Sequence, residues 1–327
     1  EYSVISNSTF LVRAKGFDTV SAQGTKGQED FAELFGTKGN DTFTARPEEA
    51  VVVGSGLTRS VTGFDYVHCY AYYGGYDEAY LYDSPGYEEL MSKAAEGYTY
   101  LTGKGIFFNR AKGFDKVWAY SQGGGDKATF YDSLGNDRFE TGYQRDTGLA
   151  QARMTAGKFQ YTTVGFRTLF AYASLGGTVD EAHLYDLPTK DEFTATPTYG
   201  KLAGPGYYCK ALGFEYTHGY AFSGGGDSAT LVGSTGADKF VGKTTQSTLT
   251  SPGSYFLRAK GFPTVLVDGL AGSDTAELYD TAGDDHLEAA GNVVKLSKVS
   301  GEELLLLYQA TNFETVKATG STGTNSK

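Results

Sequence analysis

The chain repeats a pattern about every 49 residues, and this periodicity limits its possible folds more than any other feature. A Gly-Phe pair or a close variant recurs at intervals of 47, 50, 52, 48, 48 and 51 residues. The phenylalanines that mark the repeats are Phe17, Phe64, Phe114, Phe166, Phe214, Phe262 and Phe313. Self-similarity at such a period is typical of solenoids, propellers and repeat arrays. Because a solenoid is nearly one-dimensional, we expect its function to depend on rows of equivalent side chains.

Composition is consistent with a folded, turn-rich β protein. The chain has 40% hydrophobic and 14% aromatic residues together with 45 glycines. A net charge of −11 disfavours nucleic acid as a partner, and no stretch approaches the 18 apolar residues of a membrane span. The repeat runs nearly end to end without a Pro/Ser linker, so we expect one elongated domain over residues 1–327. The acidic surface suits an extracellular or cell-surface protein, or one that collects divalent cations.

Two cysteines are present, Cys69 and Cys209, and they lie nearly three repeats apart. Stacked coils would separate them by more than the roughly 7 Å between Cα atoms that a disulfide tolerates. We therefore expect two isolated, buried thiols.

Carboxylates recur at fixed positions in six repeats. The first is Asp30, Asp77, Asp126, Asp180, Asp227 or Asp274, and the second follows eleven residues later as Asp41, Glu88, Asp137, Asp191, Asp238 or Asp285. Phe or Leu stands two residues beyond the second carboxylate, for example Phe43, Phe139 and Phe240. This half of the repeat is nearly constant in length, whereas the other half varies from 23 to 29 residues.

These features predict an all-β fold, a parallel β-helix or related β-solenoid with about two coils per repeat. Apolar residues alternate with period two, and Gly, Asp, Asn and Ser turns separate the short strands. One short helix over residues 87–96 fits the pattern weakly. A seven-bladed β-propeller is the alternative, since blades also take about 40–50 residues. The eleven-residue interval favours the solenoid, because it is too short for two strands joined by a normal antiparallel hairpin.

The turns around Gly124-Gly125-Asp126 and Gly135-Asn136-Asp137 resemble the calcium-binding nonapeptide repeats of secreted bacterial toxins. The likeness is to a style of turn, because the interval here is eleven residues and one glycine is missing. More broadly, the chain resembles the repeat regions of large bacterial surface and secreted proteins with parallel β-helix folds. That resemblance covers nearly the whole chain and implies an extracellular location without a specific activity.

Aromatic side chains recur on the strand after Gly-Phe and are our candidate ligand-binding residues. One parity of this strand is small and apolar, as in Val67, Cys69 and Val117, and should face the core. The other parity holds His68, Tyr70, Tyr72, Trp118, Tyr120, Phe170, Tyr172, His218, Tyr220 and Phe222. A second aromatic row follows the first Asp, at Phe35, Tyr82, Tyr131, Tyr185 and Tyr279. Exposed rows of this kind suit sugar stacking or burial against a protein, and covering loops or stabilising stacks are the alternative.

The Asp columns have two interpretations. Calcium binding is one, because hard cations need several oxygen ligands, and its candidate residues are Asp77, Asp126, Asp137, Asp227, Asp238, Asp274 and Asp285. Capping of each turn by its own Asp side chain is the other. A basic row at Arg13/Lys15, Arg110/Lys112 and Arg258/Lys260 either attracts an anionic polysaccharide or pairs with the acidic residues Asp18, Asp65 and Asp115.

The sequence therefore predicts a non-enzymatic structural or adhesive β-solenoid that binds a glycan or neighbouring protein along an aromatic face. The chain begins and ends within a repeat, so we also expect a segment of a longer protein or end-to-end association into filaments. A lyase or epimerase acting on an acidic polysaccharide is the alternative, with Tyr or His as the base. No Ser-His-Asp arrangement, phosphate-binding glycine loop or zinc-ligand spacing is present in the sequence.

Overall fold

The computed structural model describes residues 2–6, 11–25 and 29–321. These residues form 33 β-strands joined by turns, and none of them lies in a helix. No helix within these ranges has the length and apolar character needed to cross a membrane. The all-β prediction is confirmed, whereas the short helix expected over residues 87–96 is wrong. Strand β10 (Glu88–Lys93) occupies that segment, because Leu90 and Ser92 face the core while Glu89 and Met91 face outward.

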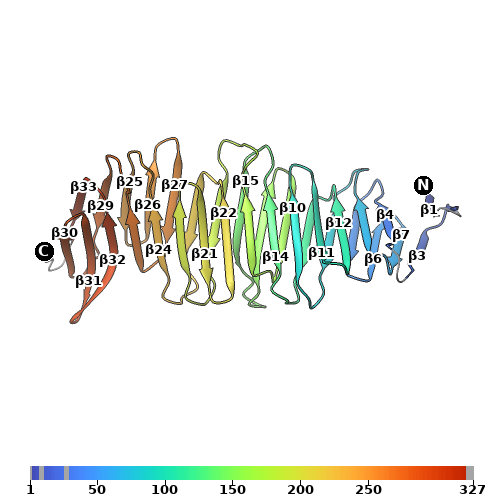
Figure 1. Cartoon of the computed structure of the whole chain (residues 1–327), viewed down its shortest axis with the longest axis horizontal. Helices are drawn as coiled ribbons and strands as arrows, with labels where there is room; N and C mark the ends of the chain where they lie inside the picture. Colours follow the sequence, from blue (N-terminus) through green and yellow to red (C-terminus); the bar gives the residue numbers. More distant parts are fainter. Residues whose placement is uncertain (1, 7–10, 26–28, 322–327) are drawn as a thin grey trace. The chain divides into compact units, whose positions relative to one another are not determined.

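Each repeat adds two single strands and a three-stranded meander. In the second repeat, β8 (Tyr66–Tyr70) follows Gly-Phe and β9 (Glu78–Tyr82) follows the first Asp. Strands β10, β11 (Tyr98–Gly103) and β12 (Phe107–Lys112) then pair in antiparallel order after the second carboxylate. Strand β8 and the meander lie in one sheet, and β9 lies in the other. Figure 1 labels the three meander strands β10, β11 and β12. The variable half of the repeat is therefore a meander within one sheet.

The chain divides into two compact units, and the first comprises residues 1–135 and 151–169. One of its sheets has the order β3-β7-β6-β5-β9-β13-β17-β16, the other has the order β4-β8-β12-β11-β10-β14, and β1 and β2 form a hairpin. Its remaining strands are β1 (Tyr2–Ser6), β2 (Leu11–Lys15), β3 (Thr19–Gln23), β4 (Phe31–Phe35), β5 (Asp41–Ala45), β6 (Glu49–Gly54), β7 (Leu57–Thr62), β13 (Lys116–Tyr120), β14 (Lys127–Tyr131), β16 (Ala150–Ala156) and β17 (Phe159–Val164).

The second unit comprises residues 136–150 and 170–327. Its sheets have the orders β15-β19-β23-β27-β26-β25-β29-β33 and β18-β22-β21-β20-β24-β28-β32-β31-β30. The strands are β15 (Asp137–Tyr143), β18 (Thr168–Tyr172), β19 (Glu181–Tyr185), β20 (Glu192–Thr196), β21 (Tyr199–Gly204), β22 (Tyr207–Leu212), β23 (Tyr216–Tyr220), β24 (Ser228–Val232), β25 (Lys239–Lys243), β26 (Gln246–Ser251), β27 (Tyr255–Lys260), β28 (Thr264–Asp268), β29 (Thr275–Tyr279), β30 (Asp285–Ala290), β31 (Val293–Ser300), β32 (Glu303–Thr311) and β33 (Thr315–Thr319). The single domain expected from the sequence stays a prediction.

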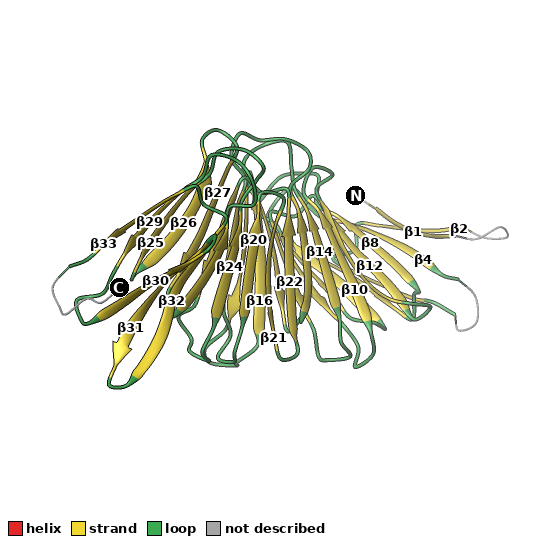
Figure 2. Ribbon diagram, turned by 60° about the vertical axis from the view of Figure 1, so that its left-hand side comes forward, coloured by secondary structure: helices red, strands yellow, loops and turns green. Residues whose placement is uncertain are grey.

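Successive passes of the chain pair in parallel, which confirms the β-solenoid. Strand β8 pairs in parallel with β4 on one side and with β12 on the other, and β23 does the same with β19 and β27. In each described meander the central strand runs the other way, as β11 does, and β1 and β2 also pair in antiparallel order. Figure 2 shows β4, β8 and β12 side by side, with loops at the ends of the strands.

Each repeat passes through the sheets three times: the strand after Gly-Phe lies in one sheet, the strand after the first Asp in the other, and the meander in the first sheet again. The next Gly-Phe strand therefore lies in the opposite sheet, and these strands alternate between the two sheets along the chain. In the first unit β3 and β13 share one sheet while β8 lies in the other, and in the second unit β23 and β33 are separated from β28 in the same way. One repeat thus makes about one and a half turns in place of the two coils expected. The physical reason is that the meander stays in one sheet and consumes residues that a second full coil would need.

The core is built from the small apolar parity predicted from the sequence. Val67, Cys69, Val117 and Ala119 are all at most 3% exposed. Both cysteines are free and buried, as expected.

A glycine precedes the marker phenylalanine because the backbone requires it. Gly113 has a φ of +87°, which L side chains rarely adopt, and a Cβ there would collide with the carbonyl oxygen of Ala71. In the seventh repeat the equivalent residue is Asn312, with a φ of +59°. Asparagine tolerates this conformation better than most residues. Phe114, which follows Gly113, is 1% exposed.

Candidate functional site

The structure does not hold the aromatic residues after Gly-Phe in one row. In the first unit, His68 and Tyr70 lie in β8 and Trp118 and Tyr120 in β13, which belong to different sheets. In the second unit, β18 and β23 also belong to different sheets. Strand β18 holds Phe170 and Tyr172, strand β23 holds His218 and Tyr220, and Phe222 lies just beyond β23. The single aromatic face expected from the sequence is thus divided between two sheets.

The two aromatic rows instead meet as stacked pairs. The strand after the first Asp of one repeat lies beside the strand after Gly-Phe of the next, as in β9 beside β13. The ring centroids of Tyr82 and Tyr120 are 5.0 Å apart and nearly parallel at 12°. Equivalent pairs are Phe35–Tyr70 at 5.2 Å and Tyr185–Tyr220 at 4.2 Å. Parallel register therefore converts two separate sequence rows into stacks on the outer faces of the sheets.

The first aromatic patch lies over β4, β8 and β12 of the first unit. It consists of Phe31, Glu33, Phe35, Tyr66, His68, Tyr70, Tyr72, Phe108 and Arg110. Phe31 is 53%, Phe35 40% and Tyr72 53% exposed, so several rings present open faces to solvent. These open rings are the part of the patch that can stack on a ligand.

Charged groups hold the central tyrosine of the first aromatic patch. The Tyr70 hydroxyl donates to Glu33 Oε1 at 3.1 Å and accepts a hydrogen bond from Arg110 at 2.8 Å. Burial raises the pKa of Tyr70. Burial, with the Arg110 charge, lowers the pKa of His68 to about 4. At neutral pH the patch therefore holds a neutral imidazole and a protonated phenol.

A second aromatic patch lies on the other sheet of the first unit and consists of Tyr80, Tyr82, Trp118 and Tyr120 with Arg46. Trp118 and Tyr120 are nearly parallel at 14°, with ring centroids 6.4 Å apart. The Arg46 guanidinium lies 4.6 Å from the centroid of Tyr82. A guanidinium over a tyrosine face is a favourable cation–π contact.

The basic residues before Gly-Phe contact tyrosines. Arg110 lies over the ring of Tyr70, and Arg258 lies over the ring of Tyr220 at 5.2 Å. The acidic residues proposed as their partners are engaged elsewhere: Asp65 accepts the amide of Asp30, and Asp115 that of Asp77, both at 3.0 Å. The pairing of this basic row with Asp65 and Asp115 is therefore not what the structure shows.

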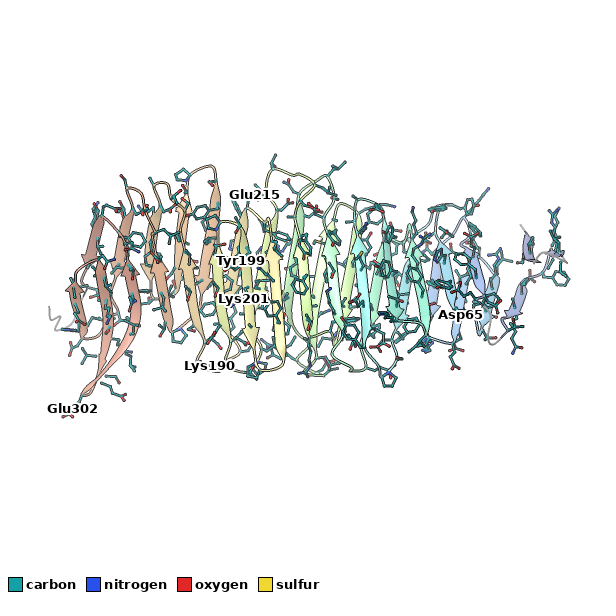
Figure 3. The ribbon with its side chains drawn as sticks, in the orientation of Figure 1. Asp65, Lys190, Tyr199, Lys201, Glu215 and Glu302 are labelled. Carbon is teal, nitrogen blue, oxygen red and sulfur yellow. The ribbon has the colours of Figure 1, made fainter. Side chains whose placement is uncertain are left out.

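The face over β21 and β22 adds further positive charge in the second unit. Figure 3 shows Tyr199 and Lys201 along β21, with Glu215 and Lys190 nearer the loops. Lys201 is opposite Lys210 in register, and Lys210 Nζ lies 4.4 Å from the ring centroid of Tyr199. This arrangement places lysine and tyrosine side by side, a combination suited to an anionic sugar.

The Asp columns form a ladder of hydrogen bonds between repeats. Asp77 accepts the backbone amide of Asp41 at 2.8 Å, and Asp41 in turn accepts that of Thr37 at 2.7 Å. The contact recurs at 2.7 Å from Glu88 to Asp126, from Asp137 to Asp180, from Asp191 to Asp227 and from Asp238 to Asp274. Asp238 and Asp285 also cap their own turns at Ser234 and Thr281. These contacts favour the turn-capping interpretation and extend it, since from Asp77 onward the first Asp of a repeat caps the preceding repeat.

Three carboxylates gather in the first unit. Ligand oxygens of Asp83, Glu88 and Asp126 lie within 4.8 Å of one another, and all three side chains are buried. Asp83 accepts the amide of Gln122 at 2.9 Å, whereas Glu88 Oε2 is buried without a hydrogen-bond partner. Burial, together with the neighbouring Asp126, raises the pKa of Asp83 well above its usual range. Of the predicted calcium ligands, only Asp126 belongs to this carboxylate triad.

Glu181, His183 and His218 form a histidine cluster on β19 and β23 of the second unit. Their ligand atoms lie within 4.8 Å of one another, and the two imidazole centroids are 4.6 Å apart. His183 Nε2 is 2.8 Å from Glu181 Oε2, and its Nδ1 is 3.1 Å from the Tyr220 hydroxyl. Burial, then Arg258, lowers the pKa of His218 to about 3. Both histidines are only 6% exposed.

Sequence reasoning included His218 but missed Glu181 and His183. His183 belongs to no row, because the rows group residues at equivalent positions of the repeat. One signal was available: the separation from Phe35 to Tyr70 equals that from Tyr185 to Tyr220. The same separation links His183 to His218.

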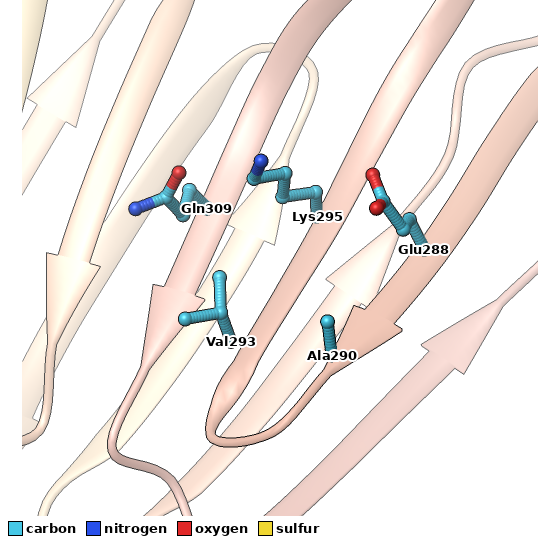
Figure 4. A pocket seen from close by; sticks show the side chains of 5 residues that line it. All are labelled: Glu288, Ala290, Val293, Lys295 and Gln309. Carbon is cyan, nitrogen blue, oxygen red and sulfur yellow. The ribbon is translucent and has the colours of Figure 1, made fainter.

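A shallow hollow of about 290 Å³ lies over the last meander of the second unit. Its lining is Glu288, Ala290, Val293, Lys295 and Gln309, from β30, β31 and β32 (Figure 4). Glu288 is opposite Lys295 in register, and Lys295 is opposite Gln309. This lining offers one acid and one base without any of the aromatic candidates.

Comparison with known proteins gives no family. No protein-family model matches the chain, and no curated protein matches it at a significant level.

Proposed function

We propose that this chain is an extracellular binding solenoid, structural or adhesive in role, that holds a glycan on the two aromatic patches of its first unit. The observation that carries the proposal is the stacked pair at the centre of each patch, Phe35–Tyr70 in one and Tyr82–Tyr120 in the other. Rigid aromatic faces lose little conformational entropy on binding and match the apolar faces of sugar rings.

Charges around the stacks favour an acidic glycan. Arg110 and Arg46 lie against the rings of Tyr70 and Tyr82. A guanidinium can bind a carboxylate or sulfate in a bidentate way while the neighbouring ring packs on the sugar. A neighbouring protein subunit with acidic and apolar side chains is the other partner that this surface would accept.

Binding is better supported than proton abstraction, the chemistry of the lyase or epimerase alternative. A general base works best with a pKa near the operating pH. Here burial raises the pKa of Tyr70 and, with Arg110, lowers that of His68 to about 4. Neither group is poised to take a proton at neutral pH.

The test is binding of the purified chain to an array of neutral and acidic glycans. Tyr70→Ala and Tyr120→Ala remove one ring from each patch, and each should weaken binding at its patch about tenfold, the equivalent of ~1.4 kcal/mol. Tyr87→Ala is the matched control, since Tyr87 is 52% exposed but lies outside both patches. Full binding by the double variant would remove the aromatic patches from the proposal.

Calcium belongs to the proposal as a stabilising ion at the carboxylate triad. Three carboxylates suit a hard cation, and Glu88 Oε2 is a buried oxygen that a cation would satisfy. End-to-end association stays a prediction. Electron microscopy of the protein with calcium and then with chelator would reveal filaments and their dependence on the ion.

A further inference from the structure

The histidine cluster combines donors that a transition metal prefers. Strands β19 and β23 pair in parallel, with His183 opposite His218 in register and Glu181 two residues before His183. Two imidazoles and a carboxylate form a common three-ligand set for zinc, which leaves a fourth position for water or a partner group. Imidazole donors favour zinc, nickel, cobalt and copper over calcium or magnesium.

A ring nitrogen without a hydrogen-bond partner indicates that the cluster is more than a packing contact. His218 is 6% exposed, and its Nδ1 is buried without a hydrogen-bond partner among the described residues. Buried polar atoms are usually satisfied, so an orphan nitrogen on one of the two clustered imidazoles needs an explanation. A metal ion held by the cluster would supply one.

A hydrogen bond to Nδ1 holds the ring of His183, in the way that the second ring nitrogen of a metal-binding histidine is usually held by a hydrogen bond. Its Nδ1 lies 3.1 Å from the Tyr220 hydroxyl, and that hydroxyl accepts a hydrogen bond from Arg258. Such a second partner fixes the ring and leaves the opposite nitrogen, Nε2, for the metal. Nε2 is the atom that faces Glu181 Oε2.

Access to the cluster is compatible with a bound cation. The Glu181 side chain is 35% exposed, so an ion can enter from its side of the cluster. Two cations lie nearby: Arg138 is paired with Glu140 at 2.6 Å, and Arg258 is bonded to Tyr220.

We propose that Glu181, His183 and His218 bind one borderline divalent transition metal ion, of the zinc, nickel or cobalt class, on the sheet face of the second unit. The first unit provides a natural comparison. There Glu33 is opposite His68 in register, and Arg110 and Tyr70 stand where Arg258 and Tyr220 do. That site has one histidine where the cluster has two.

The experiment is calorimetric titration of the tag-free, chelator-stripped protein with zinc chloride at neutral pH. Excess calcium is present so that hard-oxygen sites are occupied. The wild type should bind one zinc ion, and His183→Gln or His218→Gln should abolish that binding or weaken it at least a hundredfold. His68→Gln is the matched control and should bind as the wild type does.

A second measurement keeps the result interpretable if a buried histidine variant fails to fold. Glu181→Gln changes the most accessible ligand, and its loss of affinity should appear with an unchanged circular dichroism spectrum. Cobalt titration should give ligand-field absorption bands in the wild type that are absent from the His218→Gln variant. Absence of zinc binding by the wild type, or binding by His183→Gln and His218→Gln equal to the wild type, would overturn the proposal.

Discussion

The ring of Phe114 packs against the ring of Phe43 with 5.9 Å between their centroids, although the first belongs to the third repeat and the second to the first. The same link from one repeat to the next but one joins Phe139 to Phe214, Phe193 to Phe262 and Phe240 to Phe313. A repeat of one and a half turns requires this, because only alternate repeats bring the Gly-Phe strand back to the same sheet. The marker phenylalanine thus joins repeats that are not adjacent in sequence.

The glycine before that phenylalanine should be intolerant of substitution. Gly113→Ala places a Cβ against the Ala71 carbonyl oxygen at a φ of +87°, so we expect the free energy of unfolding to fall by more than about 2 kcal/mol. Gly105→Ala is the control, since Gly105 has a φ of +73° with nothing within 4 Å of its Cβ, and should cost about 1 kcal/mol. Urea unfolding measures both, and equal losses would mean that the close approach to Ala71 is unimportant.

The ladder of carboxylates should stabilise the fold through backbone amides. Asp77→Ala leaves the buried amide of Asp41 without its acceptor, and a loss of about 1–3 kcal/mol is expected. Asp146→Ala, at an exposed position, should change stability by less than about 0.5 kcal/mol. Thermal melting of the two variants side by side makes the comparison. A silent Asp77→Ala would contradict the role assigned to the ladder.

Stability should fall as pH rises through the acidic range. Burial raises the pKa of Asp77 and of Asp191 to about 6, above the value of about 4 in an unfolded chain. The folded state therefore holds these protons more tightly, and their contribution to stability, present below about pH 4, is lost as pH rises through 6. Asp83 extends the loss to higher pH.

Melting temperatures from pH 4 to pH 8 check this dependence. Asp83→Asn keeps a side-chain acceptor for the Gln122 amide but cannot ionise, so its melting temperature should decline less towards pH 8 than that of the wild type. Identical profiles for the two proteins would exclude Asp83 as a source of the pH dependence.

Calcium should replace the protons at the carboxylate triad. At pH 8, calcium chloride should raise the melting temperature of the wild type and chelator should reverse the rise, with about 2.7 kcal/mol gained at a hundredfold excess over the dissociation constant. Glu88→Gln removes one ligand charge and should abolish the response. A response of equal size in that variant would assign calcium to another place in the chain.

The two thiols should be inert in the native protein. Cys69 and Cys209 are fully buried, and burial raises the pKa of both. A thiol reagent that detects thiolate should therefore react with two groups in urea and with none in the folded state on the same timescale. Rapid labelling of the native protein would indicate local opening around one of the strands.

The sequence predicted the solenoid, its strands and its core parity, because period-two alternation and turn glycines are local signals. Val67 and Cys69 face inward as expected, and the free thiols follow from that burial. What failed was the assumption that equivalent strands are neighbours. Whether equivalent strands of successive repeats are neighbours depends on whether the meander stays in one sheet. The three strands of a meander show the same period-two alternation as strands that cross between sheets, so the sequence pattern does not distinguish the two arrangements.

The sequence therefore predicted many residues of the candidate site, but it did not predict which of them lie next to one another. Tyr70 and Tyr120 are on outer faces with stacked partners, but Phe35 and Tyr82 supply those partners from the row treated separately. The sequence did not predict the contact between His183 and His218 for the same reason, since His218 comes from the next repeat. Register between repeats is a property of the whole coil, and local composition does not encode it.

Because each repeat passes through the sheets three times, the number of repeats that such a solenoid can gain or lose without altering its surfaces is limited. Loss or duplication of a single repeat would exchange the sheet membership of every later strand, so that surface chemistry selected for one side would be presented on the other. Loss or duplication of two repeats would leave every face intact. Selection on a binding face would therefore retain insertions and deletions in pairs, and an odd number would serve only a lineage that had acquired a different partner.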